Sequence, residues 1–334
     1  MIKGEEVQVS IIMVNLNGEA MLKDWFETLA CQTFSDFEVV VVDNDSRDAS
    51  CRLIKELSPG TKLIKNKANF GFPKACNQGA DLALGKYLLF LNNDLELEKD
   101  CLENLIAFME ANQEVTLAGP AVFSGDKSRL DSAGFFPTLT GFFLYQNKIA
   151  NPRPYEVFGV SGAAMLVRKK AFFKVGGFDA GLFLYGEEVD LALKVRMILA
   201  GQVWLVPQAK LYHLGGQTTK KADKGFIAFH STKSRLYLLL KSLSWPFLLV
   251  ILPIHLGLLS VKAFCFLLLG KIVQVRGVVR GIFWNIKKLG LILKKRNQVQ
   301  DKKQVSDWII FTKHGKLFPV RRFLETGFSY LKTW

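Results

Sequence analysis

Short apolar runs alternate with helix-spaced apolar residues through the first half of the chain. Continuous apolar runs are typical of strands buried on both faces, and apolar residues at helical spacing indicate helices between them. The predicted strands are 7–15, 37–44, 61–66 and 86–92, and the predicted helices are 19–30, 46–58 with Ser46 as its cap, 72–84 and 98–111. This alternation predicts an α/β fold with a parallel, doubly wound sheet and right-handed crossovers.

The pattern loosens after residue 111. It predicts a strand at 115–123, then loop or small excursions over 124–156, where Gly, Pro and Asn are frequent. A strand and a short helix ending at Gly176-Gly177 are predicted within 157–179. A helix is predicted over 186–201, followed by the short strands "QVWLVP" and "AKLYHLGG".

The composition changes from about Ile227. Residues 242–270 contain Lys262 and no other Lys, Arg, Asp or Glu, a length that permits one membrane crossing. In 271–296, basic residues recur every seventh position at Arg280, Lys287 and Lys294. A second face of the same segment carries Ile272, Val275, Val279, Ile282, Ile286 and Leu289. This pattern, with Trp284, is typical of a basic amphipathic helix lying in a membrane surface.

The charge of this region suggests nucleic acid or an anionic membrane as its partner, and its apolar content decides between them. The whole chain carries a net charge of +14, and residues 260–334 hold 16 Lys or Arg against three acidic residues. Positive flanks stay cytoplasmic, and 242–270 is too short for two crossings. We therefore predict a catalytic domain over 1–235 and a membrane-associated helical region over 236–334. Its apolar segment would form an interfacial or re-entrant hairpin on an anionic cytoplasmic membrane surface.

A buried helical bundle in a soluble domain is the alternative for this C-terminal region. Nucleic acid is disfavoured as a partner, because the basic residues alternate with Leu, Ile and Phe. The N-terminal "MIKGEEVQVS" lacks the apolar segment of a secretory signal. The five cysteines form no C-x-x-C pair, which favours a reducing compartment over a disulfide framework or a zinc site.

Polar residues follow two of the predicted strands directly. Asp43 ends the second strand, and Asn92, Asn93 and Asp94 follow the fourth. Open α/β sheets bind ligands at the carboxyl ends of their strands. Asp43 could accept hydrogen bonds from a base or a ribose, and Asp94 could bind a hard divalent cation. The alternative for the stretch at Asp43 is an ordinary loop and helix cap.

Two further clusters carry candidate chemistry. In "NKANFGFPKACNQG", Gly71 allows close backbone approach, and the helix N-terminus that follows could receive an anion. In "YGEEVDLALKV", Glu187, Glu188 and Asp190 fall within one helical turn. Both clusters could instead be ordinary helix starts. Neither G-x-G-x-x-G after the first strand nor G-x-x-x-x-G-K-[ST] occurs, which disfavours dinucleotide oxidoreductases and P-loop NTPases.

The chain from Val7 to about Thr218 resembles the family 2 glycosyltransferases of GT-A fold, especially their bacterial rhamnosyltransferase-like branch. The matching pieces are "VSIIMVNLNG", "VVVVDNDSRDAS", "NFGFPKACNQG", "YLLFLNNDLEL", "VSGAAMLVRKKAFFKVGGFD", "YGEEVDLALKV" and "HLGG". Their order and spacing carry the resemblance, which covers about two thirds of the chain. It implies a GT-A sheet and transfer of a sugar from a nucleoside-diphosphate donor.

The resemblance also implies roles for individual residues. Nucleotide-sugar binding is implied for Asn15, Asn17, Asp43, Asn69, Gly71, Asn77 and Asn93. Asn92-Asn93-Asp94 stands where the family has its D-x-D metal motif, so Asp94 is the sole carboxylate there. Asp94 and His213 would hold Mg²⁺ or Mn²⁺ together with the donor diphosphate. Glu187-Glu188 stands for the family's acidic pair, usually Glu-Asp, so the base is one methylene longer.

These roles imply inverting transfer to an acceptor, with Glu188 as the base. Glu187 and Asp190 would orient the acceptor and the base. The basic, apolar C-terminal region points to a lipid-linked saccharide acceptor and to polysaccharide synthesis. A sugar-1-phosphate nucleotidyltransferase is a rival, but "NLNGEAMLKDW" is not its Gly-rich, Arg-bearing loop. A catalytically silent, membrane-anchored scaffold is a second rival. The acids at Asp43, Asp94 and Glu188 disfavour it.

Overall fold

The chain divides into two compact units in the computed structural model, which describes residues 7–214 and 223–316. Unit 1 comprises Met1–Phe135, Tyr145–Phe183 and Glu187–Thr218. Unit 2 comprises Phe136–Leu144, Leu184–Gly186 and Thr219–Trp334. The predicted boundary at residue 235 falls inside helix α8 (Lys224–Ser242), and all of that helix belongs to unit 2.

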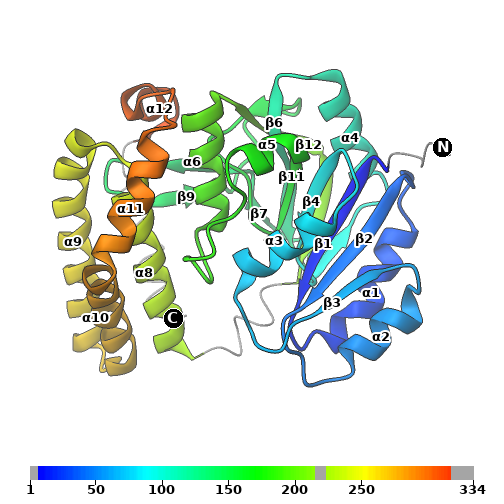
Figure 1. Cartoon of the computed structure of the whole chain (residues 1–334), viewed down its shortest axis with the longest axis horizontal. Helices are drawn as coiled ribbons and strands as arrows, with labels where there is room; N and C mark the ends of the chain where they lie inside the picture. The colour runs from blue at the N-terminus through cyan, green and yellow to red at the C-terminus, as the bar shows by residue number, and fades with distance from the viewer. Residues whose placement is uncertain (1–6, 215–222, 317–334) are drawn as a thin grey trace. The chain divides into compact units, whose positions relative to one another are not determined.

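Unit 1 is built on a mixed sheet flanked by helices (Figure 1). Its strands are β1 (Val9–Asn15), β2 (Phe37–Asp43), β3 (Lys62–Lys65), β4 (Tyr87–Leu91), β5 (Leu95–Leu97), β6 (Val115–Ser124), β7 (Leu130–Ser132), β10 (Tyr155–Glu156), β11 (Ala164–Arg168) and β12 (Gln202–His213). The main order is β10-β12-β6-β11-β4-β1-β2-β3, with β5 on β12 and β7 on β6.

The parallel part of the sheet agrees with the sequence prediction. β1 pairs in parallel with β2 and β4, and β2 pairs in parallel with β3. β11 differs, because it runs antiparallel between β4 and β6. A parallel neighbour needs a crossover, usually a helix, and no helix lies between β6 and β11. The chain therefore re-enters the sheet from the edge where β6 ends.

Helices cover both faces of the sheet in unit 1. They are α1 (Glu19–Ala30), α2 (Ser50–Leu57), α3 (Phe72–Leu82), α4 (Cys101–Ala111), α5 (Lys169–Lys174) and α6 (Glu187–Leu199). Trp25 of α1 packs with apolar side chains of β1, β4 and α4 in one buried core. Phe90 of β4 points to the other face, where its ring lies 5.0 Å from Phe172 and 4.7 Å from Phe178. Side chains packed on both faces of the sheet thus hold the parallel strands in place.

Two local predictions were wrong. Ser46 does not cap the second helix, which begins at Ser50 with Ala49 before it and no side-chain cap. The two short strands predicted after residue 201 form the single strand β12, with a register shift between Val206 and Lys210. The 124–156 region agrees with its prediction of loop or small excursions, because its four strands, β7, β8 (Phe135–Pro137), β9 (Phe143–Tyr145) and β10, have two or three residues each.

Unit 2 contains a set of helices (Figure 1). After α8 they are α9 (Trp245–Leu268), α10 (Ile272–Lys287), α11 (Leu289–Gln300) and α12 (Asp307–His314). α9 continues through Pro253 without a turn, so the hairpin predicted within 242–270 does not form. Among the described residues, α9 is the one helix long and apolar enough to cross a membrane by length and composition.

Glycines let α10 approach α8 closely. A Cβ atom at Gly277 would lie 2.5 Å from the carbonyl oxygen of Gly225, and one at Gly281 would lie 2.9 Å from Cβ of Thr232. Asn285 Nδ2, one turn further, donates to the carbonyl of Lys233 at 3.0 Å. This close packing leaves the apolar face predicted for 271–296 turned largely outward. The predicted single helix is divided at Lys288 into α10 and α11.

Unit 2 exposes many large apolar side chains. Leu249 is 72% exposed and Leu268 is 70% exposed. We define the apolar surface of unit 2 as Leu249, Val250, Ile254, Val261, Phe264, Leu267 and Leu268 of α9 with Ile272, Val273, Val279, Phe283 and Ile286 of α10. So many exposed large apolar side chains on two helices are unusual for a soluble monomer and are typical of an interaction surface.

Candidate active site

A buried amide links the ends of three strands in unit 1. Asn15 Nδ2, at the end of β1, donates to Asp43 Oδ2 at 3.0 Å and to Ser46 Oγ at 3.1 Å. Asn93 Nδ2, after β4, donates to Asn15 Oδ1 at 3.1 Å. Asp43 Oδ1 accepts from the Ser46 backbone at 3.0 Å. Asn15, Asp43 and Asn93 are thus brought together, and Asn15 holds the other two in place.

Gly18 is required by this network. A Cβ atom there would lie 2.2 Å from Asn15 Oδ1 and 2.5 Å from Asn93 Nδ2. Asn17, beside it, is exposed and has a left-handed backbone with φ of 51°. Its Oδ1 accepts from the Arg47 backbone at 2.8 Å, so in this structure its side chain holds the loop after β2.

Asp94 and His213 meet across the pair β5–β12. His213 Nε2 lies 3.2 Å from Asp94 Oδ2, and the Leu214 backbone donates to the Asp94 carbonyl at 2.9 Å. The predicted metal ligands are therefore neighbours, although they lie far apart in sequence.

This pair of groups fits a shared divalent ion. Cis ligands at about 2.1 Å on an octahedral ion are about 3 Å apart, close to the observed separation. Among the described residues, no group of three or more His, Cys, Asp or Glu side chains could hold a metal ion. Further ligands would have to come from substrate oxygens or water.

Helix α6 presents its acids in its first turn. Glu188 Oε1 accepts from the Tyr145 hydroxyl at 3.0 Å. A Cβ atom at Gly162 would lie 3.5 Å from Glu188 Cβ, and the next residue, Ala163, accepts from the Asn92 backbone at 3.0 Å. Glu188 is therefore connected through this short segment to the polar stretch that follows β4. Glu188 as a residue is half-buried.

Glu187 has a different environment from Glu188. It is 8% exposed, and its Oε2 has no hydrogen-bond partner among the described residues. Burial, and next the neighbouring Glu188 carboxylate, raise the pKa of Glu187 to about 8. Glu187 therefore holds a proton at neutral pH. A carboxyl group whose pKa is shifted by burial and a neighbouring charge is common at catalytic sites.

Asp190 is fully buried in an ion pair. Its Oδ2 lies 2.9 Å from Lys194 Nζ, and Lys194 also donates to the carbonyl of Gly177. This contact ties α6 to the glycine pair after α5. Asp190 therefore has a structural contact in addition to the catalytic role predicted for it.

The start of α3 is less open to an anion than the sequence indicated. The Phe72 backbone donates to the Phe183 carbonyl at 2.9 Å, and Pro73 has no N–H group. Gly71 has φ of 84°, and a Cβ atom there would lie 2.5 Å from the same carbonyl oxygen. The expected anion site therefore loses two of its first backbone donors.

Asn69 and Asn77 also make internal contacts. Asn69 Oδ1 accepts from Asn44 Nδ2 at 2.8 Å and from the Gly71 backbone at 2.9 Å. Asn77 Nδ2 donates to the Phe178 carbonyl at 2.8 Å, and its Oδ1 accepts from the Phe178 backbone at 2.9 Å. Both amides thus shape the loops around the site, and their contact with a nucleotide stays a prediction.

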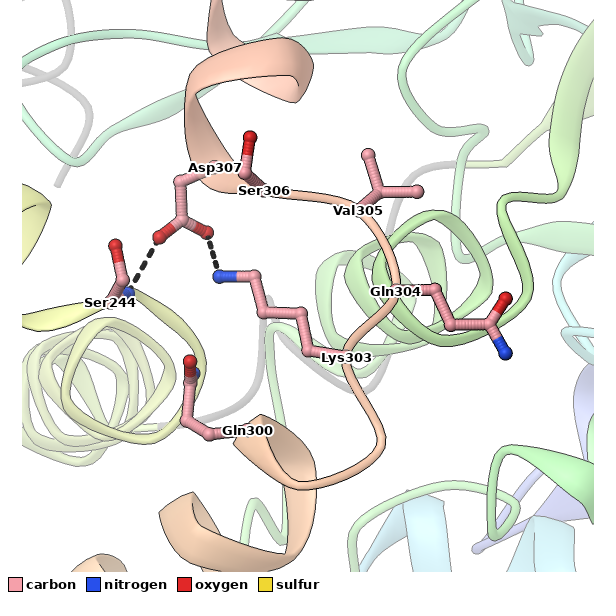
Figure 2. A pocket seen from close by; sticks show the side chains of 7 residues that line it. All are labelled: Ser244, Gln300, Lys303, Gln304, Val305, Ser306 and Asp307. Carbon is pink, nitrogen blue, oxygen red and sulfur yellow. Dashed lines mark hydrogen bonds and ion pairs between the residues drawn. The ribbon is translucent and has the colours of Figure 1, made fainter.

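A pocket of about 340 Å³ lies in unit 2, and its charged side chains pair with each other (Figure 2). Asp307 Oδ1 lies 2.6 Å from Lys303 Nζ, and Asp307 Oδ2 accepts from the Ser244 backbone at 2.6 Å. Gln300, Gln304, Val305 and Ser306 complete its lining. Asp307 and Lys303 neutralise each other. Their contacts, with that of Asp307 to Ser244, connect the ends of α9, α11 and α12.

The arrangement in unit 1 brings several chemical functions to one edge of the sheet. It has a buried carboxylate at Asp43, a carboxylate–imidazole pair at Asp94 and His213, and an acidic pair at Glu187 and Glu188. The family model for glycosyl transferase family 2 matches residues 10–176, which is half of the chain and includes Asp43 and Asp94. The chain belongs to the family 2 glycosyltransferases.

Curated relatives agree with this family and with its rhamnosyltransferase-like branch. This glycosyltransferase is 25% identical over 265 residues to an N-acetylglucosaminyl-diphospho-decaprenol L-rhamnosyltransferase of Mycobacterium tuberculosis. The match covers 70% of this chain and 85% of the relative. The resemblance drawn from the sequence motifs is confirmed.

Solved structures confirm the GT-A fold of this glycosyltransferase. The mannosyltransferase PcManGT from Pyrobaculum calidifontis, in complex with GDP-Man and Mn²⁺, matches with a TM-score of 0.55 and 13% identity. The match covers 84% of this chain and 75% of that one. GalNAc-T7 with UDP, GalNAc and Mn²⁺ matches with a TM-score of 0.54 and 18% identity, over 62% of this chain and 44% of that one.

Sequence reasoning missed three residues of this site. Ser46 had been assigned to a helix cap, but its hydroxyl joins the Asn15 network and accepts from the Asn17 backbone at 2.8 Å. Tyr145 lay in a region expected to be mostly loop and carried no signal. Gly18 was visible in "NLNG", but its necessity follows from the approach of two side chains distant in sequence.

Proposed function

We propose that this glycosyltransferase moves a sugar, with inversion, from a nucleoside diphosphate to a saccharide carried on a lipid. The observation that carries the proposal is the contact of Asp94 with His213 beside the Asn15 network. Such a site can receive a nucleotide at Asp43 and its diphosphate near Asp94. The rhamnosyltransferase relative, whose name contains a diphospho-decaprenol, supports the choice of acceptor. Synthesis of a cell-surface polysaccharide is the role we propose for the reaction.

Donor binding is assigned to Asn15, Asn17, Asp43, Asn69, Gly71, Asn77 and Asn93. Asp43 would accept hydrogen bonds from the nucleoside, while Asn15 keeps its carboxylate oriented. Asp94 and His213 would hold Mg²⁺ or Mn²⁺, and both structural neighbours described above contain Mn²⁺. A divalent cation bound there would neutralise charge that develops on the departing diphosphate.

Glu188 is the proposed general base. Its carboxylate takes the proton from the acceptor hydroxyl as that oxygen bonds to the anomeric carbon. The bond from this carbon to the diphosphate oxygen breaks at the same time, and the nucleoside diphosphate leaves with the electron pair. The Tyr145 hydroxyl, 3.0 Å from Glu188 Oε1, orients the base. Glu187, which holds a proton, and Asp190 keep the start of α6 in place.

Unit 2 is proposed to bind the cytoplasmic face of a membrane. Its apolar surface is rich in Leu, Val, Ile and Phe. The charged residues of α10 and α11 are all Lys or Arg. An interfacial helix with apolar and basic faces binds anionic lipid surfaces in this way. Membrane binding would keep the enzyme close to a lipid-linked acceptor.

The test is a donor screen followed by a base substitution. Full-length protein is incubated with nucleoside-diphosphate sugars and a lipid-linked saccharide, and release of nucleoside diphosphate is measured. With the active donor, Glu188→Gln should lower transfer by about 10²–10⁴-fold, the usual contribution of a positioned general base. Donor affinity should be unchanged, since Asp43 and Asp94 are untouched.

Tyr145→Phe is the matched variant for this experiment. It removes the hydroxyl that contacts the base but not the base itself, so its loss should be smaller than that of Glu188→Gln. Transfer by Glu188→Gln close to that of the wild type would contradict the assignment of the base. Absence of turnover with every donor, together with intact donor binding, would favour the silent scaffold.

A further inference from the structure

A connected set of four amide side chains lies beside the end of β2 in unit 1. Asn44 directly follows that strand and is buried, with 2% of its surface exposed. Asn66 and Asn69 belong to the loop between β3 and α3, and Gln78 belongs to α3. The Asn66 backbone donates to the Asp43 carbonyl at 2.9 Å. The loop is therefore attached to the strand end that carries the proposed donor-binding carboxylate.

These amides form a continuous chain of hydrogen bonds. Asn44 Nδ2 donates to Asn69 Oδ1 at 2.8 Å, and Asn66 Nδ2 donates to Asn44 Oδ1 at 3.1 Å. Asn66 and Gln78 exchange two hydrogen bonds, each of 2.9 Å. The buried amide of Asn44 thus connects the loop to the end of β2, and Gln78 connects it to α3.

Two backbone N–H groups fix the direction in which these amides point. The Gly71 backbone lies 2.9 Å from one amide atom of Asn69. A backbone N–H group can only donate, so this atom of Asn69 is its oxygen. The Phe70 backbone, at 3.1 Å, identifies the oxygen of Asn44 in the same way. The remaining amide atom of Asn44 is its nitrogen, which is the atom required opposite Asn69 Oδ1.

The amide nitrogen of Asn69 is the donor that this chain of hydrogen bonds leaves available. Asn69 Oδ1 already accepts two hydrogen bonds, one from Asn44 and one from Gly71. No described residue accepts a hydrogen bond from Asn69 Nδ2, and Asn69 is exposed. An amide oxygen has two lone pairs, and both are used here. Asn69 therefore offers a ligand two N–H groups and no acceptor.

The neighbouring carboxylate indicates which part of the donor meets these N–H groups. Asp43 would repel a phosphate group placed against it, and the proposed cation site that would attract the diphosphate is at Asp94. An uncharged nucleoside can instead donate to Asp43 and accept from Asn69. Nucleobases are suited to this, because their edges carry N–H groups next to acceptor oxygen or nitrogen atoms.

We propose that Asn44 is a positioning residue for donor binding, which turns the N–H groups of Asn69 toward a hydrogen-bond acceptor of the donor's nucleoside. The inference rests on the proposed donor site at Asp43 and adds to it the direction of a second hydrogen bond. Asn44 is buried and acts through Asn69.

The first test asks whether Asn69 donates to the ligand. Full-length protein is titrated calorimetrically with UDP, dTDP, GDP, ADP and CDP, and the one that binds most tightly is used. Asn69→Asp keeps an oxygen for Gly71 and Asn44 but replaces the donating nitrogen by an oxygen, so affinity should fall about 10-fold or more. Asn151→Asp is the matched control, because exposed Asn151 accepts from the Arg153 backbone at 2.9 Å in the same way. It should bind like the wild type.

The second test is a double-mutant cycle on Asn44 and Asn69. Asn44→Asp keeps the oxygen that accepts from Phe70 and Asn66 but sets a second oxygen against Asn69 Oδ1. Asn69 must then turn, and affinity should fall about 10-fold. Combined with Asn69→Ala, the same change should cause no further loss, because the residue that it positions is gone. An effect of the added charge or damage to the fold would persist, so additive losses would overturn the proposal.

Further controls separate this contact from phosphate binding and from misfolding. Asn69→Asp should leave the affinity for pyrophosphate with Mn²⁺ nearly unchanged, and an equal loss for pyrophosphate would overturn the assignment to the nucleoside. Asn44→Ala repeats the cycle without an added charge, and circular dichroism melting checks each variant. Because Asn69 is exposed, its variants should fold in any case. Unchanged nucleoside-diphosphate affinity in Asn69→Asp would overturn the proposal by itself.

This result is distinguishable from failure of the proposed reaction. If the two substitutions are coupled in nucleoside-diphosphate binding but no sugar is transferred, the positioning role stands and the proposed function fails. If the wild type transfers sugar while the two losses are additive, the proposed function stands and the positioning role fails. With the active donor, Asn44→Asp should raise KM for the donor about 10-fold and leave kcat nearly unchanged, because Glu188 is untouched.

Discussion

Replacing Glu187 with Gln should make unit 1 more stable, and increasingly so as the pH rises. Glu187 is buried beside Glu188, and these two causes raise its pKa from the ordinary value of 4.5 to about 8. Below pH 4.5 the folded and unfolded chains both hold the proton, so the group has no effect on pH dependence. Between about pH 4.5 and pH 8 the unfolded chain has lost the Glu187 proton while the folded chain retains it. Folding then takes up a proton, and stability falls as the pH rises.

The size of the effect follows from the shift. Each pH unit between about 4.5 and 8 lowers the free energy of unfolding by about 1.4 kcal/mol. Over the whole window the loss is about 5 kcal/mol, which is a large share of the stability of a typical domain. Gln cannot ionise, so Glu187→Gln should avoid this loss. Its advantage over the wild type should be small near pH 4.5 and full above pH 8.

Hydrogen exchange of β4, followed by mass spectrometry, measures this difference within unit 1. Exchange at pH 5, 6.5 and 8 is compared after correction for the intrinsic rates. Asp24→Asn, an exposed change on α1, is the control and should follow the wild type. Glu188→Gln should also flatten the pH dependence in part, because the Glu188 carboxylate contributes to the shift. An advantage of Glu187→Gln that is the same at all three pH values would refute the reasoning.

Two further outcomes are expected. Asp94→Ala and His213→Ala should each raise the Mn²⁺ concentration needed for half-maximal transfer by about 10-fold or more, as measured in metal titrations. The Asp94 change should be the more severe because it removes a formal charge, and equal activity in chelator and in Mn²⁺ would contradict the metal site. Full-length protein should fractionate with membranes, and high salt should weaken attachment without abolishing it, since apolar burial supplements the charge term. Recovery in the soluble fraction without detergent would rule out this mode of attachment.

Local patterns predicted the parallel half of the sheet and most helices. β1, β2 and β4 are nearly continuous apolar runs, and burial on both faces requires that composition wherever the strands lie. The direction of β11 was not predictable in this way, because "AMLVR" reads the same in a parallel or an antiparallel position. Direction depends on the connection from β6, which is a property of the fold rather than of the strand.

The candidate site also has residues that the sequence predicts and contacts that only the fold produces. Asp43 and Asp94 were found because they lie at or just after the ends of strands, and strand ends are recognisable in sequence. The partnership of Asp94 with His213 came through resemblance to a family, since nothing local connects them. The contact of Tyr145 with Glu188 and the retained proton of Glu187 depend on tertiary burial. No pattern around "LYGEEVD" distinguishes the two glutamates.

The place of β12 in the sheet determines when the site can exist. His213 is the last residue of that strand, and it reaches Asp94 through the pairing of β12 with β5. His213 follows Asp94 by 119 residues, so a nascent chain emerging from the ribosome has Asp94 long before it has this partner. Non-local pairings of this kind form slowly. At the proposed metal site, Asp94 would therefore gain His213 only when synthesis has passed most of unit 1 and approaches α8.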